Sequence, residues 1–465
     1  MFAFILSFLY WGYLASTTQM IIMHDAQGFQ TIGASLRESG LRACLTQNSR
    51  EPIYPTIIAL SIVLGEILSA HAQSIQVVLQ LLLLFLSQWF VFLILKKLGV
   101  RRCIQAGAIV YIGISPALVN AALSSFSEIT TLPLSAGILL VNLMVLQRVR
   151  DKRTKDVFLL GGLLGILFAL MAFVKAAYEF IFFVFLFSYM IAFLIFVFQK
   201  KNKLSMSIGV FMLSFVLAFQ SLVLSYKWMK KNNGHSFSIV KGRGAYVLYN
   251  SAALRAEKIT LKKILSLAVY TIGPGYCNDV FGIEECSFWN TGNLEEFMHK
   301  EEIQKKLREA NSEESNRILK EAAIKKIKKH PFQFSLLMGM DALRLFFWES
   351  TRIGFVVYPH WLEQVFGNQI FKFMIRALMG FCSFFAVLFW VLDIFRKRKK
   401  LFALEEQEGL GATYFAFILI IIFSHVGLYA FVGAAVARHA LPLAPLYLIL
   451  IAVCINKLSV FNNRE

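Results

Sequence analysis

The chain has 465 residues, of which 57% are hydrophobic and only 16% are charged, and it contains 45 phenylalanines. This composition is more apolar than the core of a soluble protein requires, so it excludes a single soluble domain and indicates a membrane protein. The formal charge of +19 does not indicate a nucleic-acid partner, because the Lys and Arg residues gather in short clusters beside apolar runs, which is typical of membrane-topology signals.

Apolar runs of about 20 residues recur along most of the chain, and this is the length at which an α-helix crosses roughly 30 Å of hydrocarbon. The first run begins at Met1 without a basic segment before it and continues to Ile22. Because it is longer than the core of a cleaved signal peptide, we expect a retained anchor. In chain order, the other predicted spans cover residues 73–95, 103–123, 129–146, 158–174, 177–198, 204–226, 371–395, 412–432 and 441–455.

Basic clusters between these spans predict the topology. They lie at alternate connections, in residues 96–102, 148–155, 200–203 and 396–400. Because basic loops stay in the cytoplasm, we expect both termini there. The same rule exports residues 23–72, 124–128 and 227–369.

The sequence therefore predicts an all-α polytopic membrane protein with about 10 transmembrane helices. We expect interfacial helices in the first outer loop and a mostly helical long outer segment. The expected parts are an N-terminal transmembrane bundle (1–226) with the first outer loop (23–72), an extracytoplasmic or interfacial segment (227–369) and C-terminal transmembrane helices (370–465).

The first exported loop is expected to hold two short helices on the outer leaflet. Gly40 is a typical end for the first helix, whose apolar residues recur at helical spacing: Ala26, Phe29, Ile32, Gly33 and Leu36. The second is expected to begin after Pro55, with Ser61 and Glu66 on its polar side. Its apolar side is expected to hold Ile57, Leu60, Leu64, Ile67 and Leu68.

The long exported segment is expected to be charged and helical over residues 295–329, with a weak apolar stripe before Pro331. Residues 332–348 are apolar but carry Asp341 and Arg344, which favours an interfacial helix over an eleventh span. Cys277 and Cys286 lie in the same exported segment, and both a disulfide and two free thiols remain open. No C-x-x-C, H-E-x-x-H, Walker or G-x-G-x-x-G pattern indicates a zinc finger, metalloprotease or nucleotide loop.

Two acidic residues are expected at the outer membrane interface. His24 and Asp25 follow the first span, and Glu128 lies at the equivalent depth between the third and fourth spans. A carboxylate so near hydrocarbon costs several kcal/mol unless it is compensated, so each is a candidate functional residue, and bundle packing would bring them together. The alternative is two unrelated interface residues with side chains in water.

Three basic residues are expected at the same depth: Arg50, Lys175 and Arg438. Together they would hold a phosphate. The simpler alternative is that each reaches the interface or pairs locally, as Lys175 would with Glu179 one helical turn away.

Four of these segments, in this order and at a consistent depth, resemble the GT-C glycosyltransferase superfamily, in the branch of bacterial aminoarabinose and protein O-mannosyl transferases and their oligosaccharide-modifying relatives. The resemblance covers nearly the whole chain and includes a basic helix followed by residues 330–332 (HPF). Each motif alone is weak, and the order carries the resemblance. The motifs are residues 24–29 (HDAQGF), 50–55 (REPIYP), 127–128 (SE) and 437–442 (ARHALP).

The resemblance implies a GT-C-like fold and transfer of a sugar, with inversion, from a polyprenyl-phosphate donor to an acceptor hydroxyl of a glycan, lipid or protein. It also implies a multi-pass protein of the bacterial cytoplasmic (inner) membrane, whose active site faces the periplasm or exterior. Besides donor and acceptor, the expected partners are membrane lipids, with no nucleic acid.

Asp25 matches the catalytic first-loop acid of the family, and we expect it to remove the proton of the acceptor hydroxyl. Glu128 would orient the acceptor or, with Asp25, hold a divalent metal, which is the one cofactor considered. The leaving phosphate would be stabilised by donor-binding residues Arg50, Lys175 and Arg438. Expected substrate contacts within or beside these motifs are His24, Tyr54 and His439.

The chain departs from the family pattern at three points. Glu51-Pro52 replaces a doubled proline, Phe29 stands where Tyr is frequent, and Asp25 lacks an adjacent Glu, which disfavours the protein-mannosyl branch. Two other functions remain open. A lipid-linked oligosaccharide polymerase or ligase needs outer arginines but no acid directly after the first span, whereas a transporter or flippase should have broken helices and buried acids near mid-bilayer.

Overall fold

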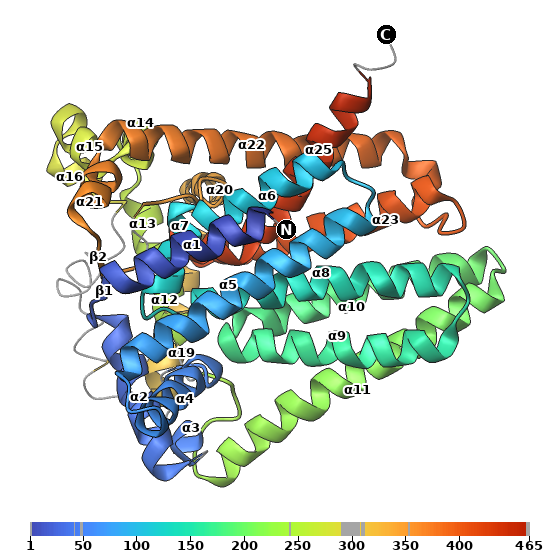
Figure 1. Cartoon of the computed structure of the whole chain (residues 1–465), viewed down its shortest axis with the longest axis horizontal. Coiled ribbons are helices and arrows are strands. Elements are labelled where there is room, and N and C mark those ends of the chain that lie inside the picture. Colours follow the sequence, from blue (N-terminus) through green and yellow to red (C-terminus); the bar gives the residue numbers. More distant parts are fainter. Residues whose placement is uncertain are drawn as a thin grey trace.

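The structure is a computed structural model that describes residues 2–40, 42–46, 50–240, 243–289, 312–351 and 354–461, together with Leu307. Helices make up nearly all the regular structure of these residues, and the described part contains one two-stranded sheet. Figure 1 shows most of the long helices running side by side along one direction. The chain is an all-α, multi-pass membrane protein.

Eight helical segments in the described residues are long and apolar enough to cross a membrane. A ninth is present if α6 (Arg102–Ile114) and α7 (Pro116–Leu123), which meet at 45°, form one bent span. The eight are α5 (Ala72–Lys97), α8 (Glu128–Arg150), α9 (Thr154–Val174), α10 (Ala177–Phe198), α11 (Asn202–Asn232), α22 (Gln369–Arg396), α23 (Gln407–Phe431) and the run Ala437–Ser459. That run combines α24 (Ala437–Ala440), a 3-10 turn η4 (Leu441–Leu443) and most of α25 (Ala444–Phe461).

The first helix, α1 (Phe2–Thr17), is apolar but shorter than the predicted span, which continued to Ile22. It ends where the chain becomes the extended strand β1 (Gln19–Met20), which pairs antiparallel with β2 (Val356–Val357). The backbone N–H of Ile21 also donates to the carbonyl of Phe355 at 3.0 Å. These bonds hold the beginning of the first loop against the segment between α20 and α21.

Helix α8 lies at the centre of the bundle and is its most enclosed span, because 89% of the residues in its apolar 18-residue stretch are buried. It contacts α5, α9, α23 and α25. Glu128 is its first residue, where the helix dipole favours a negative charge. The hydroxyls of Thr130 and Thr131 donate to the carbonyls of Ser127 and Glu128, respectively, and so fix this first turn.

The first loop folds into α2 (Asp25–Ser39), α3 (Arg42–Thr46) and α4 (Ile53–Ile67). Gly40, at a φ of 61°, follows α2 as predicted, and the buried residues of this helix are the five predicted ones. Helix α4 begins before Pro55 rather than after it, and the side that was expected to be polar is partly buried. Ser61 and Gly65 are buried, whereas apolar Leu60 and Ile67 are exposed. Small residues on the packed side allow close helix approach, which is usual in membranes.

The long segment between α11 and α22 consists of short helices. It begins with α12 (Arg243–Val247), a π-helical turn η1 (Leu248–Ala253) and α13 (Leu254–Lys258). A disulfide joins Cys277 and Cys286, which settles the pairing that the sequence left open. The next helices are α14 (Leu261–Ile272), α15 (Pro274–Phe281) and α16 (Ile283–Ser287), and the disulfide links α15 to α16.

The second half of this segment contains α19 (Ser312–Lys329), α20 (Pro331–Arg344) and α21 (His360–Gly367). Helix α19 confirms the later part of the predicted charged helix, and residues 295–311 lie outside the described residues apart from Leu307. Helix α20 covers most of the predicted interfacial helix 332–348, ends earlier, at Arg344, and is not among the candidate spans. Figure 1 shows it end-on, so it runs across the direction of the bundle. A 3-10 turn, η3 (Arg398–Lys400), follows the last residue of α22.

Candidate functional site

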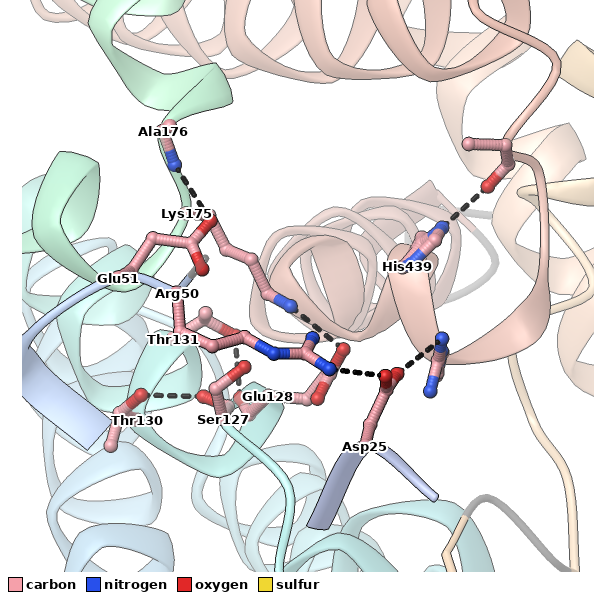
Figure 2. A network of polar contacts seen from close by, with 12 residues as sticks. Asp25, Arg50, Glu51, Ser127, Glu128, Thr130, Thr131, Lys175, Ala176 and His439 are labelled. Carbon is pink, nitrogen blue, oxygen red and sulfur yellow. Dashed lines mark hydrogen bonds and ion pairs between the residues drawn. The ribbon is translucent and has the colours of Figure 1, made fainter. Parts of the chain in front are cut away.

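Asp25 lies between two arginines that come from distant parts of the chain. Its Oδ1 is 2.6 Å from Nη2 of Arg50, and its Oδ2 is 3.0 Å from Nη2 of Arg438. The Asp25 side chain is 25% exposed, so it points neither into the lipid nor freely into water. Figure 2 shows this carboxylate with a dashed line to each cationic partner. The fold thus brings together three of the residues that the sequence singled out.

The residues around Asp25 fit the two guanidinium groups. A Cβ at Gly28 would lie 3.6 Å from Nε of Arg50, in ordinary van der Waals contact, so Arg50 packs directly against this turn of α2. Arg50 also lies 5.0 Å from the centre of the Phe29 ring, and Arg438 lies 5.5 Å from that of Phe126. Cation–π contacts of this kind stabilise partly desolvated cations. Both guanidinium groups are therefore held in place by packing as well as by charge.

Glu128 forms a second ion pair beside the first. Its Oε1 is 2.9 Å from Nζ of Lys175, and the two side chains are 3% and 15% exposed. Its Oε2 is buried and has no hydrogen-bond partner in the structure. The local pairing considered for Lys175 is wrong, because Glu179 pairs with Lys227 instead. A buried acceptor atom without a partner is costly unless a ligand supplies one.

The two ion pairs belong to one charged cluster, defined as Asp25, Arg50, Glu128, Lys175 and Arg438. Lys175 and Arg438 are among the groups whose charges act on Glu128, and so is His439. The cluster holds three cations and two carboxylates, so one positive charge is in excess. A phosphate would neutralise this excess.

His439 is held next to the charged cluster by its neighbours in the loop before α25. Its Nδ1 lies 2.5 Å from the carbonyl of Ala434, and its own carbonyl lies 2.7 Å from Nε2 of His425. The first contact requires Nδ1 to carry the proton, which leaves the other ring nitrogen of His439 as an acceptor. The ring is thus fixed in orientation, and Figure 2 shows it near the cationic partners of Asp25.

His24 and Tyr54 occupy different positions. His24 is exposed, directly precedes Asp25 and has a φ of 49°, which is strained for a residue with a side chain. Tyr54 is only 1% exposed, and its hydroxyl donates to Oε1 of Gln80 at 2.6 Å and accepts from Nε2 of Gln76 at 3.1 Å. Tyr54 therefore belongs to a buried polar network, in which Ser125 also takes part.

The part of the chain that the structure describes contains no group of three or more His, Cys, Asp or Glu side chains that would hold a metal ion. Asp25 and Glu128 are each paired with cationic side chains. These cations already supply positive charge of the kind that a metal would provide. A metal role for the two carboxylates stays a prediction.

Sequence reasoning did not single out Arg255, which lies beneath the loop that leads to Arg438. This side chain is 1% exposed, and its Nη1 donates to Oδ2 of Asp341 at 3.1 Å and to the carbonyl of Gly433 at 3.2 Å. Arg344 also pairs with Asp341, at 3.2 Å. Asp341 and Arg344 were noted as charges in an apolar helix, whereas the only signal for Arg255 was a cation between Leu254 and Ala256. We call Arg255, Asp341 and Arg344 the buried triad.

Comparison with known proteins was carried out at three levels. No family model matches the chain, and no curated protein or solved structure matches it either.

Proposed function

We propose that this chain is a glycosyltransferase that moves a sugar from a polyprenyl-phosphate donor to an acceptor hydroxyl of a glycan, lipid or protein. The observation that carries the proposal is the Asp25 carboxylate held between Arg50 and Arg438, at one end of a transmembrane bundle. The order of the four motifs that resemble GT-C enzymes supports the same reaction.

In this proposal the excess positive charge of the charged cluster receives the donor phosphate. Arg50 and Arg438 present planar guanidinium groups suited to phosphate oxygens, and Lys175 adds a point charge. The bond between the sugar carbon and the phosphate oxygen breaks during transfer, and the polyprenyl phosphate leaves with the electron pair. Its charge grows in the transition state, so these cations stabilise the transition state more than the ground state.

Asp25 is the proposed general base. Both of its oxygens face arginines in the structure, and an arginine that turns to the donor phosphate frees an oxygen. That oxygen accepts the proton of the acceptor hydroxyl as the hydroxyl oxygen bonds to the sugar carbon on the face opposite the phosphate. Donor binding would therefore prepare the base, and the acceptor would be activated only when the donor is present.

Glu128 is proposed to position a substrate hydroxyl. Its Oε2 is buried without a hydrogen-bond partner in the structure, whereas its Oε1 is occupied by Lys175. A hydroxyl that donates to Oε2 would remove the cost of this unmet acceptor. The ion pair with Lys175 fixes the direction of the carboxylate and compensates its charge.

Charge and cysteine chemistry support the proposed location of the site. Lys96 and Lys97 lie in the last turn of α5, and Arg148 and Arg150 lie in the last turn of α8, at the helix ends opposite Asp25. Basic residues at those ends favour a cytoplasmic side there. The disulfide lies in the segment assigned to the other side, where oxidising conditions favour it. We therefore place the protein in a bacterial cytoplasmic membrane, with Asp25 facing the exterior.

One observation bears on the transporter alternative. Helices α6 and α7 break at Ser115, and a buried carboxylate, Glu349, lies at the break. Glu349 accepts from the N–H of Ala117 at 2.7 Å, the hydroxyl of Ser115 at 2.8 Å and the hydroxyl of Tyr111 at 2.5 Å. In transporters such a helix start receives a substrate anion. Here the carboxylate of the protein itself takes that position, which argues against a transport site.

The deciding experiment uses purified protein with radiolabelled polyprenyl-phosphate sugars and lipid, glycan and peptide acceptors. We expect a wild-type product, and a loss of about 10²- to 10⁴-fold in the Asp25→Asn variant with unchanged protein abundance. Glu38→Gln is the matched control, because Glu38 is an exposed acid on the same helix. Wild-type turnover by Asp25→Asn would refute the role of the base.

The same assay separates the rival functions by product. A polymerase or ligase would give longer lipid-linked glycans or move whole oligosaccharides. A transporter would move labelled lipid or sugar across liposomes without bond exchange, and Asp25→Asn would still do so. Either pattern would replace the proposed transfer reaction.

A further inference from the structure

A cavity lies apart from the charged cluster, between α14, α20 and α22. It has an accessible volume of about 410 Å³, within the range of small-molecule sites. Apart from Thr271, Arg344 and Arg376 its lining is apolar. Figure 1 shows α20 end-on beside α22, and α14 near one end of that helix. The cavity therefore combines a hydrocarbon-like interior with two guanidinium groups.

The side of the cavity is open to the hydrocarbon of the membrane. Leu343, Phe373 and Phe381 line it and are also exposed on the protein surface. Arg376 follows the first residue of α22, Gln369, by seven positions, which corresponds to about 10 Å along the helix. Arg376 therefore lies in the half of α22 that contains its first residue, and an arginine there would reach toward the lipid phosphates on that side of the membrane.

The charges around the cavity are not balanced. Arg344 and Arg376 act on each other as like charges, and Arg255 acts on Arg344 in the same way. The carboxyl groups that act on these arginines are Asp341 and Glu349. Three guanidinium groups thus face two carboxyl groups. Burial also raises the pKa of Glu349.

The hydrogen bonds of these arginines are also incomplete. Arg376 donates to the carbonyls of Glu349 and Thr271, and Arg344 donates to Asp341 and to the carbonyl of Trp289. A guanidinium has five N–H groups, so each of these arginines keeps donors for a further acceptor. Nε and Nη2 of Arg255 are buried without a partner. An anion at the cavity would balance the charge and accept from the remaining donors of Arg344 and Arg376, the two arginines that line it.

We propose that this cavity binds one acyl chain of an anionic phospholipid whose phosphate pairs with Arg344 and Arg376. The apolar interior suits the chain, and the charge excess suits a phosphodiester without a compensating cation. A phospholipid is favoured over the polyprenyl donor because a cavity of about 410 Å³ is small for a long polyprenyl chain and its arginines are not those of the charged cluster. This inference does not depend on the proposed enzymatic activity.

The bound lipid would also stabilise the charged cluster indirectly, through contacts that lead from Arg344 to the loop that carries Arg438. Arg344 is linked through Asp341 to Arg255, and Arg255 donates to the carbonyl of Gly433. Gly433 is followed by Ala434, and the carbonyl of Ala434 accepts a hydrogen bond from the His439 ring. The buried triad holds two cations and one carboxylate, so a phosphate at Arg344 would neutralise its excess positive charge. The loop that carries Arg438 would then be held more firmly.

The test is native mass spectrometry of the purified, delipidated full chain with added phosphatidylglycerol or phosphatidylcholine. We expect one phosphatidylglycerol bound at least about tenfold more tightly than phosphatidylcholine, the difference expected for one charge-assisted contact. Arg376→Ala should remove this preference. Arg396→Ala is the matched control, because Arg396 is an exposed arginine at the other end of α22.

A second variant keeps all charges and fills the cavity. Ala377 lines the cavity, so Ala377→Phe should lower phosphatidylglycerol binding about tenfold, whereas Ala15→Phe on the exposed face of α1 should not. Equal binding of the two phospholipids, or unchanged binding by Ala377→Phe, would overturn the proposal. Displacement of phosphatidylglycerol by a lower concentration of polyprenyl phosphate would also overturn it, since the cavity would then belong to the carrier lipid.

Discussion

The ion pair between Glu128 and Lys175 allows a quantitative prediction. Glu128 is 3% exposed and Lys175 is 15% exposed, so removing either partner leaves a charge with little solvent. Breaking a buried pair in this way costs about 3–5 kcal/mol of folding free energy. Because Lys175 keeps some contact with solvent, we expect the lower end, about 3 kcal/mol, for Lys175→Met. Glu128→Gln should cost less, since the ammonium can turn toward water.

The double variant decides whether the cost comes from the pair. With both charges removed, the loss should be smaller than the sum of the single losses by roughly 2 kcal/mol. The assay is reversible unfolding of purified protein in detergent micelles, followed by tryptophan fluorescence. The exposed counterpart Glu66→Gln, whose partner is Arg37, should show a much smaller effect because the two side chains are 51% and 44% exposed, respectively. Additive single effects, within about 0.5 kcal/mol, would refute the reasoning.

The remaining predictions concern the donor, the helix break and the packing of the first loop. Arg438→Ala should raise the apparent donor dissociation constant by at least about tenfold, the ~1.5–3 kcal/mol of a charge-assisted contact, and an unchanged value in a donor titration would contradict phosphate binding. Burial raises the pKa of Glu349 above its usual 4.5, so its contribution to stability is full below that pH and is lost as pH rises through the folded-state pKa. Glu349→Gln should therefore flatten the pH dependence of thermal unfolding above pH 4.5, and a curve of wild-type slope would argue against it. A Cβ at Gly33 would lie 2.5 Å from Cγ2 of Ile58, so Gly33→Ala should destabilise the protein by about 1–3 kcal/mol. Gly12→Ala is the control, because a Cβ at Gly12 would meet open space. Equal melting temperatures of the two variants would count against this packing.

The helices of the first loop show what periodicity can predict. The buried face of α2 was predicted residue by residue, because Phe29 and Leu36 follow the 3.6-residue repeat and Gly40 ends the helix. The polar side of α4 was predicted only in part, because Glu66 is exposed as expected but Ser61 is buried. In a soluble protein Ser61 would face water, but beside lipid the small side chains pack inward and the apolar ones face outward.

The break between α6 and α7 was missed although its signal was present. Residues 103–123 were predicted as one span because they are apolar throughout. Pro116 has no N–H to continue the helix, and the hydroxyl of Ser115 accepts from the N–H of Leu118 to begin a new one. Hydropathy measures the length of an apolar run and not its direction, so a bend inside it is invisible.

For the candidate site, depth was predictable but partners were not. Alternation of basic clusters placed Asp25, Glu128 and Arg438 at one membrane surface. The pairing of Lys175 with Glu128 could not be read from the chain, because Lys175 lies in an extended turn between α9 and α10 and not within a helix. The i, i+4 rule for Lys175 and Glu179 holds only when both residues lie on one helix. The partners of Arg255 could not be predicted either, because they lie in α20 and in the loop after α23, far from Arg255 in sequence.

The distant origin of the two Asp25 partners has a consequence for biosynthesis. Arg50 is 25 residues away in sequence and can meet the carboxylate once the first loop has crossed the membrane. Arg438 arrives only with α24 and α25, after every other helix of the bundle has been made. A nascent chain therefore lacks one of the two arginines that face Asp25 for nearly the whole of translation. Insertion of that helix pair completes the charged cluster last, so under the proposed function a partly inserted protein would not act on carrier lipids.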